Sequence, residues 1–325
     1  MIISRTPFRI SFAGGGTDLS SFYKREPGAT ISTAINKYVI VTINKRFDDI
    51  IRAGYSRIEK VKYVNEIKHP LIREALKVLK INSSIEITSI ADIPSGTGMG
   101  SSGSFAVGLL NVLNAYKGKY LSKEQLAREA CRLEIDILGE PVGKQDQYIA
   151  SFGGFRYMQF NPDGSVVVES IACPDKTKKE LNSRLMLFYT GITRKSSDIL
   201  EEQHRITHHK LDSLRRMKDI AKDMKTILTR NKSLDAFGEL LHEGWFLKKN
   251  LVGKITNDRI DYFYKKSRKA GAIGGKILGA GGGGFLLLYC RISQQNKVRQ
   301  ALGGLREVPF NFETAGSSII YKGWS

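Results

Sequence analysis

One segment of this sequence has the composition of a phosphate-binding loop. Between Ile93 and Ser104 it holds four glycines and four serines, after a β-branched run and before an apolar helical one. Glycines let successive backbone N–H groups approach an anion, and a helix start adds unpaired N–H groups and a positive dipole end. The hydroxyls of Ser101 and Ser102 can contact phosphate oxygens or a cation. The segment therefore predicts a phosphate cradle, with a serine-capped strand-to-helix turn as the alternative.

This loop differs from the two most common nucleotide-binding motifs. It lacks the Gly-Lys-Ser/Thr ending of a Walker loop, and Gly96-x-Gly98-x-Gly100 has only a superficial likeness to a dinucleotide fingerprint. The acidic residue expected about 20 residues further on in a dinucleotide-binding unit is also missing. These differences disfavour a nicotinamide-dependent oxidoreductase.

Two further glycine-rich segments also suit the close approach of a ligand to the backbone. Gly14 to Asp18 follow a predicted strand that contains Arg9, so a charged ligand can approach while Asp18 binds hydroxyl groups. A turn capped by Asp18 is the alternative. Gly279 to Gly284 lead directly into the apolar strand 285–289, which argues against a flexible linker.

A fourth segment, Gly143 to Gln147, places charge beside glycine. It contains Lys144 and Asp146, and Glu134 and Asp136 lie just upstream on a predicted helix. Taken alone, the pattern favours a simple surface ion pair between Asp146 and Lys144.

The charge balance favours an anionic partner without identifying it. The 325 residues include 51 Lys and Arg against 32 Asp and Glu, a formal net charge of +19. Basic and acidic residues alternate along stretches such as 210–232, which is typical of solvated helix faces. A nucleic-acid-binding protein is the alternative from another class, and it predicts steeply salt-dependent binding. It leaves the glycine-rich segments without a role and lacks the stacking motifs of common RNA modules.

Other features indicate a soluble protein of a reducing compartment. Cys131, Cys173 and Cys290 are far apart and lack metal-ligand spacing. No apolar run approaches the roughly 18 residues that span a bilayer, and the first residues lack a signal-peptide pattern. We therefore expect a cytoplasmic location.

The pattern of elements predicts an α+β protein of about two domains. Strand-forming runs and helical spacings alternate irregularly, without a regular βαβ repeat. A polar, Lys-rich stretch at 175–183 predicts the join between the halves. The expected strands lie at 2–12, 30–47, 50–64, 85–90, 185–189, 285–289 and 317–321, with a hairpin after Gly153-Gly154. The expected helices lie at 69–80, 105–116, 123–138, 196–230, 233–250 and 257–270.

The order of the motifs resembles the GHMP kinases, named for galacto-, homoserine, mevalonate and phosphomevalonate kinases. The four segments occur in the family's order along nearly the whole chain, and Pro-x-Gly-x-Gly-x-Gly-Ser-Ser is specific. Arg-x-Ser-Phe-Ala-Gly-Gly-Gly-Thr-Asp and Gly-Glu-Pro-Val-Gly-Lys-Gln-Asp-Gln most resemble the D-glycero-D-manno-heptose 7-phosphate kinases. Gly15-Gly16-Thr17 stands where galactokinases carry Gly-Glu-His, which disfavours galactose.

This resemblance implies a two-domain fold and an ATP- and Mg²⁺-dependent reaction. Residues 1–180 would form a ribosomal-protein-like α+β domain and residues 181–325 a ferredoxin-like domain, with ATP between them. The acceptor would be the anomeric hydroxyl of a heptose 7-phosphate, in the synthesis of bacterial surface-sugar precursors. Another sugar-1-kinase, such as a fucokinase, is the alternative within the family. The expected partners are ATP and a sugar phosphate, without nucleic acid or membrane; a homodimer is left open.

The resemblance also implies roles for individual residues. Asp146 matches the aspartate that accepts the proton of the sugar hydroxyl, either as a true base or as an orienting charge, and Arg9 pairs with it. Ser102 and Glu134 match the Mg²⁺ ligands, with Asp136 close by. The residues expected around the ATP phosphates are Pro94, Gly96, Gly98, Met99, Gly100, Ser101, Ser102 and Gly103. Those expected around the sugar are Gly15, Gly16, Thr17, Asp18, Lys144, Arg194, Gly282 and Gly283.

A sugar phosphate needs its own basic pocket, because it carries roughly two negative charges. Arg194 and Lys195, which follow the strand 185–189, are candidates together with Lys144. The first turn of a surface helix capped by Ser196 is an equally good interpretation of that segment.

Overall fold

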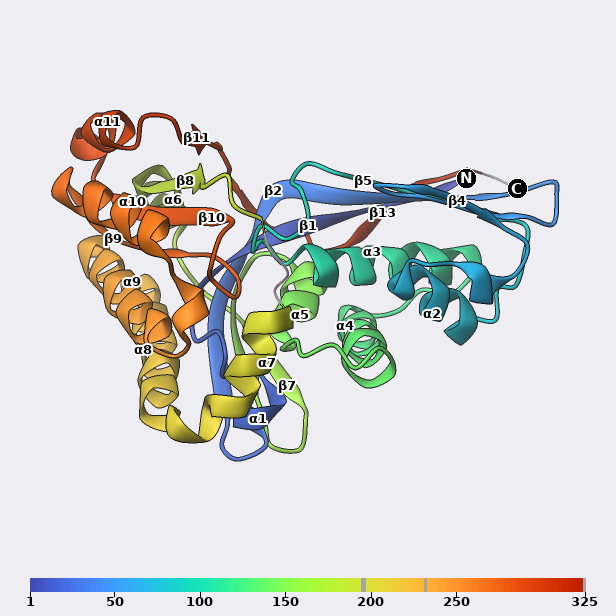
Figure 1. Ribbon diagram of the computed structural model, residues 1–325, viewed down its shortest axis with the longest axis horizontal. Coiled ribbons are helices and arrows are strands. Elements are labelled where there is room, and N and C mark those ends of the chain that lie inside the picture. The colour runs from blue at the N-terminus through green and yellow to red at the C-terminus, as the bar shows by residue number, and fades with distance from the viewer. Residues whose placement is uncertain (194–196, 231–232, 324–325) are drawn as a thin grey trace.

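The computed structural model describes residues 1–193, 197–230 and 233–323. The strands of these ranges form two sheets, and helices cover both of them (Figure 1). The larger sheet contains the N-terminal strands and the smaller one lies in the second half of the chain. This is the two-domain α+β architecture that the sequence predicts.

In the described ranges, nine strands form the larger sheet, which is antiparallel except where β3 and β5 pair. β2 pairs along one side with β1, and along the other with β6 near its start and β5 near its end. The main path runs β13 (Ser318–Lys322), β1 (Ile2–Ala13), β2 (Gly28–Lys45), β5 (Ile85–Ala91), β3 (Ile51–Gly54) and β4 (Ile58–Val61). β6 (Phe155–Phe160), β7 (Val166–Ser170) and β12 (Phe312–Glu313) lie off this path.

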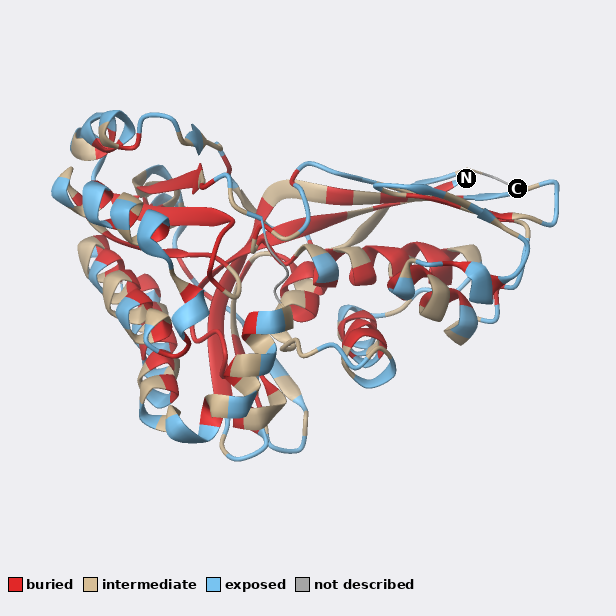
Figure 2. Ribbon diagram, in the orientation of Figure 1, coloured by how far each residue is buried: buried red, intermediate tan, exposed pale blue. Residues whose placement is uncertain are grey.

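One face of the larger sheet is covered by helices, with α3 (Ser101–Tyr116) packed on β1 and β2. Residues are buried all along α3 because α2, α4 and α5 pack around its other sides (Figure 2). The helices of this half are α1 (Ser20–Tyr23), α2 (Pro70–Val78), α4 (Lys123–Cys131) and α5 (Gln145–Phe152), with 3-10 turn η1 (Val64–Glu66) and π-helical η2 (Arg132–Ile137).

The smaller sheet has the order β11–β8–β10–β9. Every residue of β10 is buried, as its continuous apolar run predicts. The strands are β8 (Leu185–Tyr189), β9 (Ala272–Ile277), β10 (Phe285–Cys290) and β11 (Arg306–Glu307). The helices of this half are α6 (Asp175–Arg184), α7 (Ser197–Ile206), α8 (Leu211–Thr229), α9 (Leu234–Lys249), α10 (Asp258–Lys269) and α11 (Ile292–Ala301), with 3-10 turns η3 (Thr207–His209) and η4 (Gly253–Ile255).

The two halves are tied together at several points. α9 packs on β9, while α8 packs on α9 and also on β1 and β2. The final strands β12 and β13 return to the larger sheet, where they pair with β2 and β1. The buried Lys276 of β9 donates hydrogen bonds to the carbonyls of Ser11 and Phe12, at 2.9 and 3.0 Å. Burial lowers the pKa of this amine well below its usual range, so β9 is held against the end of β1 by a desolvated side chain.

Most of the predicted strands and helices are confirmed, with several differences. The helix predicted at 196–230 forms, from Ser197 on, the helices α7 and α8 with the 3-10 turn η3 between them, and α5, β9 and α11 were not predicted. The stretch at 175–183, which the sequence predicts as the join between the halves, forms helix α6 between β7 of the larger sheet and β8 of the smaller one. The helix predicted at 105–116 begins at Ser101, since the serines of the loop already form its first turn. The helix predicted at 123–138 changes at Arg132 into the π-helical segment η2. None of the helices in the described ranges has the length and apolar content to cross a bilayer.

Candidate active site

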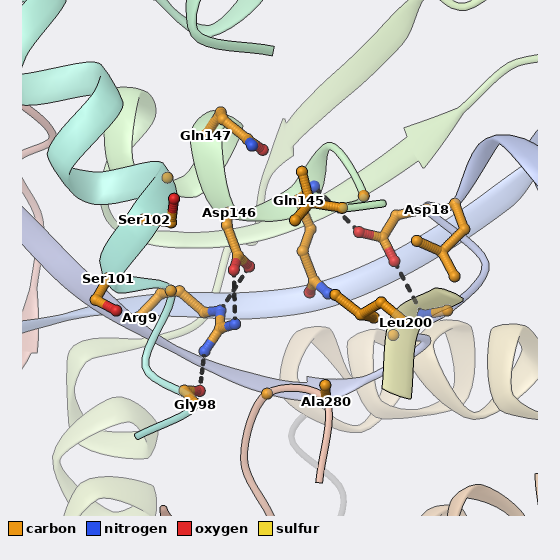
Figure 3. Close-up of a pocket in the computed structure, with 18 of the residues that line it drawn as sticks. Arg9, Asp18, Gly98, Ser101, Ser102, Gln145, Asp146, Gln147, Leu200 and Ala280 are labelled. Carbon is orange, nitrogen blue, oxygen red and sulfur yellow. Dashed lines mark hydrogen bonds and ion pairs between the residues drawn. The ribbon is translucent and has the colours of Figure 1, made fainter. Parts of the chain in front are cut away.

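A single cavity collects the predicted motifs from distant parts of the chain. It is lined by the end of β1, the glycine-rich loop before α3, the start of α5, and one face of α7. Figure 3 shows Asp146 and Asp18 on opposite sides of Gln145 in this cavity. The lining residues that the sequence predicts are Arg9, Gly15, Gly16, Asp18, Gly96, Gly98, Gly100, Ser101, Ser102, Gly103, Glu134 and Asp146.

Arg9 and Asp146 form a two-pronged ion pair at the centre of this cavity. Nε and Nη2 of Arg9 each donate to one carboxylate oxygen of Asp146 at 2.8 Å, and Nη1 donates to the carbonyl of Gly98 at 2.5 Å (Figure 3). The side chain of Arg9 is only 3% exposed, whereas that of Asp146 is 26% exposed. The parallel geometry fixes the orientation of the carboxylate as well as its charge.

Local structure explains how these two side chains are aimed. The pairing of β1 with β2 shifts register between Pro7 and Phe8, and such irregularities re-aim the side chains that follow, here Arg9. Asp146 lies in the first turn of α5, where the helix dipole favours a carboxylate. The Arg9 guanidinium is buried, whereas the Asp146 carboxylate is partly exposed to the cavity. Asp146 can therefore accept a hydrogen bond from a ligand there.

The glycine-rich loop has a backbone that side chains would disrupt. Gly96, Gly98 and Gly100 have φ angles of 74°, 81° and 75°, in the left-handed region. A Cβ at Gly98 would lie 2.4 Å from the carbonyl oxygen of Leu278, and one at Gly103 would lie 2.9 Å from the Cβ of Asp146. The loop is therefore packed tightly against both the start of the glycine-rich segment 279–284 and α5.

The loop delivers the start of α3 to the cavity. α3 begins at Ser101, and no side chain caps its first turn. An uncapped 16-residue helix presents several unpaired N–H groups and a positive dipole end. Because Gly100, Ser101 and Ser102 all line the cavity, an anionic group there meets these donors directly.

Ser102 and Glu134 form the second polar group of the cavity. The Ser102 hydroxyl donates to one carboxylate oxygen of Glu134, and Nε2 of Gln147 donates to the other at 2.6 Å. Burial raises the pKa of Glu134 to about 7, although both hydrogen bonds oppose this shift. The η2 segment supplies this carboxylate through a local widening of the helix.

The residues around Glu134 fit a magnesium ion bound together with a nucleotide. Mg²⁺ prefers oxygen ligands and is commonly held by one or two protein groups, with phosphate and water oxygens completing its shell. Ser102 and Glu134 provide one hydroxyl and one carboxylate side by side. In the described ranges no cluster of three or more His, Cys, Asp or Glu side chains could hold a metal alone. The donor set is therefore of the type that shares its metal with phosphate.

Asp18 is held by backbone donors at the opposite end of the cavity. The N–H groups of Gly16 and Gln145 donate to its two oxygens at 2.9 and 3.3 Å. Burial raises the pKa of Asp18, and the negative charge of Asp146 raises it further. A Cβ at Gly143 would lie 1.9 Å from Oδ2 of Asp18, so only glycine fits there.

Several predicted residues support the loops rather than line the cavity. The Thr17 hydroxyl donates to the carbonyls of Gly14 and Ala29, and Met99 is fully buried. The amine of Lys144 turns away, donating to the carbonyl of Gly164 at 2.5 Å and lying over the ring of Tyr23. The remaining residues of this kind are Pro94, Gly282 and Gly283. Arg194 and Lys195 lie outside the described residues.

The cavity also contains residues that the sequence did not single out. Leu200 and Gln203 come from α7, and Lys248, at the end of α9, donates from Nζ to the carbonyl of Gly279. These three residues lie within ordinary helical patterns of the sequence, and no motif around them indicates a site. Gln145 and Gln147 flank Asp146 in the cavity. Both lie within the predicted segment 143–147, but no role was predicted for either of them from the sequence.

Comparison with known proteins agrees with this arrangement. The profile of the GHMP kinases N terminal domain matches residues 62–154, and that of the GHMP kinases C terminal domain matches residues 217–306. Together they cover more than half of the sequence. The chain belongs to the GHMP kinases. The resemblance that the motifs predicted is confirmed.

Individual relatives extend over nearly the whole GHMP kinase chain. The D-glycero-alpha-D-manno-heptose 7-phosphate kinase of Campylobacter jejuni is 29% identical over 93% of both chains. The galactokinase of Pyrococcus furiosus is 26% identical over 99% of this chain and 97% of its own. A crystal structure described as a D-glycero-D-manno-heptose 1-phosphate kinase from Bacteroides thetaiotaomicron superposes with a TM-score of 0.83 over all of both chains, at 24% identity.

Proposed function

We propose that this GHMP kinase transfers the γ-phosphoryl group of ATP to the anomeric hydroxyl of a D-glycero-D-manno-heptose 7-phosphate. The observation that carries the proposal is the Arg9–Asp146 ion pair, which lies in the same cavity as the uncapped start of α3 and Asp18. The 29% identity to a heptose 7-phosphate kinase over 93% of both chains supports the choice of sugar.

The glycine-rich loop and the start of α3 bind the polyphosphate of ATP. Backbone N–H groups between Gly96 and Ser102 donate to phosphate oxygens, since the left-handed glycines leave no side chains in the way. Ser102 and Glu134 would hold Mg²⁺, which would neutralise charge on the phosphates. Glu134 would serve as a ligand only in its deprotonated form, because the metal binds the carboxylate.

Asp146 orients the acceptor and receives its proton. Its exposed carboxylate edge accepts the hydrogen bond of the anomeric hydroxyl, while Arg9 fixes its orientation from behind. Phosphoryl transfer depends mainly on positioning and charge neutralisation. The proton therefore moves late, as the new oxygen–phosphorus bond forms. Asp18 accepts a hydrogen bond from another hydroxyl of the sugar and so holds the ring in place.

A fucose-1-kinase is the second candidate. Two larger proteins, the bifunctional fucokinase/GDP-fucose pyrophosphorylase of Arabidopsis thaliana and the L-fucokinase/L-fucose-1-P guanylyltransferase of Bacteroides fragilis, match about nine-tenths of this chain at 25 to 26% identity. The chain covers only 30 to 35% of those proteins, whereas its match to the Campylobacter jejuni kinase covers 93% of both chains.

The test is an acceptor panel with purified protein, ATP and Mg²⁺. Heptose 7-phosphate, unphosphorylated heptose, L-fucose, D-galactose and mevalonate are compared by ADP release, and the product is analysed by phosphorus NMR. We expect heptose 7-phosphate to give the highest kcat/KM, with the new phosphate on C1. A preference for fucose, or phosphorylation at another carbon, would replace this proposal. The Asp146→Asn variant serves as the blank for contaminating kinases.

A further inference from the structure

Gln203 is a buried polar side chain of the cavity that the proposed chemistry leaves without a role. It lies on α7, is only 3% exposed and lines the same cavity as Asp18. Among the described residues, its Nε2 atom is out of reach of solvent and finds no hydrogen-bond acceptor. A buried amide donor without a partner destabilises a fold, and such groups often serve a ligand.

The carboxamide of Gln203 lies directly against the loop that carries Asp18. A Cβ at Gly16 would be 2.2 Å from Nε2, so the absence of a side chain at Gly16 makes room for the amide. The N–H of Gly16 in turn donates to Oδ1 of Asp18 at 2.9 Å. Gly16 therefore lies between the buried, unpaired Nε2 of Gln203 and the buried carboxylate of Asp18, and both of these side chains line the cavity.

α7 is fixed at its C-terminal end, so this placement is built into the fold. The hydroxyl of Thr207 donates to the carbonyl of Gln203 at 2.8 Å, and it also hydrogen-bonds to the hydroxyl of Ser21 on α1 at 2.9 Å. Leu200, one turn earlier on the same face of α7, adds an apolar surface to the cavity beside Gln203. A polar donor next to an apolar surface matches a sugar ring, which presents both hydroxyls and C–H groups.

We propose that Gln203 is a positioning residue for the acceptor, donating an N–H to a sugar hydroxyl that itself donates to Asp18. The inference rests on the proposed function, since it concerns the sugar of that reaction. A hydroxyl is one donor and two acceptors, so a single hydroxyl satisfies both groups at once. The terminal torsion of glutamine is broad, so the carboxamide turns toward the cavity with little cost. An acceptor without this hydroxyl leaves both buried groups unpaired and is rejected.

The test compares Gln203→Met with the wild-type enzyme and with Glu202→Gln. Methionine keeps the length of the side chain and removes its hydrogen bonding. Glu202 is the neighbour on α7, and its carboxylate lies 3.6 Å from the amine of Lys254. For Gln203→Met we expect the KM for heptose 7-phosphate to rise about tenfold to a hundredfold, the loss typical of one buried hydrogen bond. The KM for ATP should change less than about threefold and Tm should not fall, because the variant removes an unpaired polar group rather than a contact.

Monodeoxy analogues of heptose 7-phosphate identify the hydroxyl. Removing the hydroxyl that Gln203 contacts should lower the kcat/KM of the wild-type enzyme. The same deoxy analogue should cause no such loss in Gln203→Met, because this variant already lacks the hydrogen bond to that hydroxyl. Glu202→Gln should keep the full wild-type pattern.

Two outcomes overturn the role of Gln203 while leaving the proposed function intact. The first is an active wild type whose Gln203→Met variant keeps its sugar KM within twofold. The second is a parallel rise of both KM values with a lower Tm, which marks Gln203 as part of the packing only. If the wild type phosphorylates no sugar of the panel, the proposed function fails and this inference fails with it.

Discussion

The buried carboxyl of Glu134 makes a quantitative prediction about stability. Its side chain is 1% exposed, and burial raises its pKa from 4.5 to about 7. The folded protein therefore binds more protons than the unfolded chain between pH 4.5 and 7, and stability falls as the pH rises through this window. The conversion of 1.36 kcal/mol per pKa unit gives a cost of about 3 kcal/mol, fully present above pH 7 and absent below pH 4.5.

Replacing Glu134 by glutamine removes this cost without changing the shape of the side chain. We expect Glu134→Gln to gain about 2 to 3 kcal/mol in the free energy of unfolding at pH 8 relative to the wild type. This difference in the free energy of unfolding should become smaller as the pH falls toward 4.5, and it should no longer change with pH below that value. The hydrogen bond with Gln147 is kept if that carboxamide turns over, since its buried Oε1 has no partner among the described residues. Any stability that the substitution loses through altered hydrogen bonds is independent of pH. It therefore does not change how the difference in the free energy of unfolding varies with pH.

The measurement is urea unfolding at a series of pH values, in EDTA and without nucleotide. Glu239→Gln removes the same charge from an exposed position on α9 and serves as the control. Its difference from the wild type should be small and flat with pH. The reasoning is refuted if the difference between Glu134→Gln and the wild type does not change between pH 4.5 and 8, or if it grows toward low pH.

Two further predictions concern the reacting pair and the loop. Asp146→Asn should lower kcat by about 10²- to 10⁴-fold, the usual contribution of a positioned proton acceptor, while the Kd of ATP stays within about threefold; a variant with near-normal kcat in a coupled ADP assay would contradict this. Gly98→Ala should lower the free energy of unfolding by about 2 kcal/mol or more, because it combines a left-handed φ of 81° with a clash against the Leu278 carbonyl. Gly118→Ala is the matched control in urea unfolding, since Gly118 has a φ of 73° and nothing within 4 Å; equal losses at both sites would show that the close approach has no energetic weight.

Local sequence patterns were enough to predict most of the elements and those parts of the site that lie within short motifs. Apolar periodicity located most strands and helices, because burial on one face imposes a period of about 2 or 3.6 residues. The glycine-rich loop before α3 was recognisable since its chemistry, backbone donors followed by a helix start, is contained in about twelve consecutive residues. Arg9, Asp18, Ser102, Glu134 and Asp146 were likewise identified because each lies in or near such a motif.

The side chains that share the cavity, their hydrogen-bond partners and their pKa values depend on the tertiary structure. Lys144 is only two residues before Asp146 in the sequence, but its amine donates to the carbonyl of Gly164, whereas Arg9, more than a hundred residues away, makes the ion pair. Gln203 is an ordinary polar position of a helix until α7 packs over Gly16. The raised pKa of Glu134 exists only once water is excluded from around it. Contacts between distant segments and the removal of water are properties of the packed chain, so no local pattern of residues can carry them.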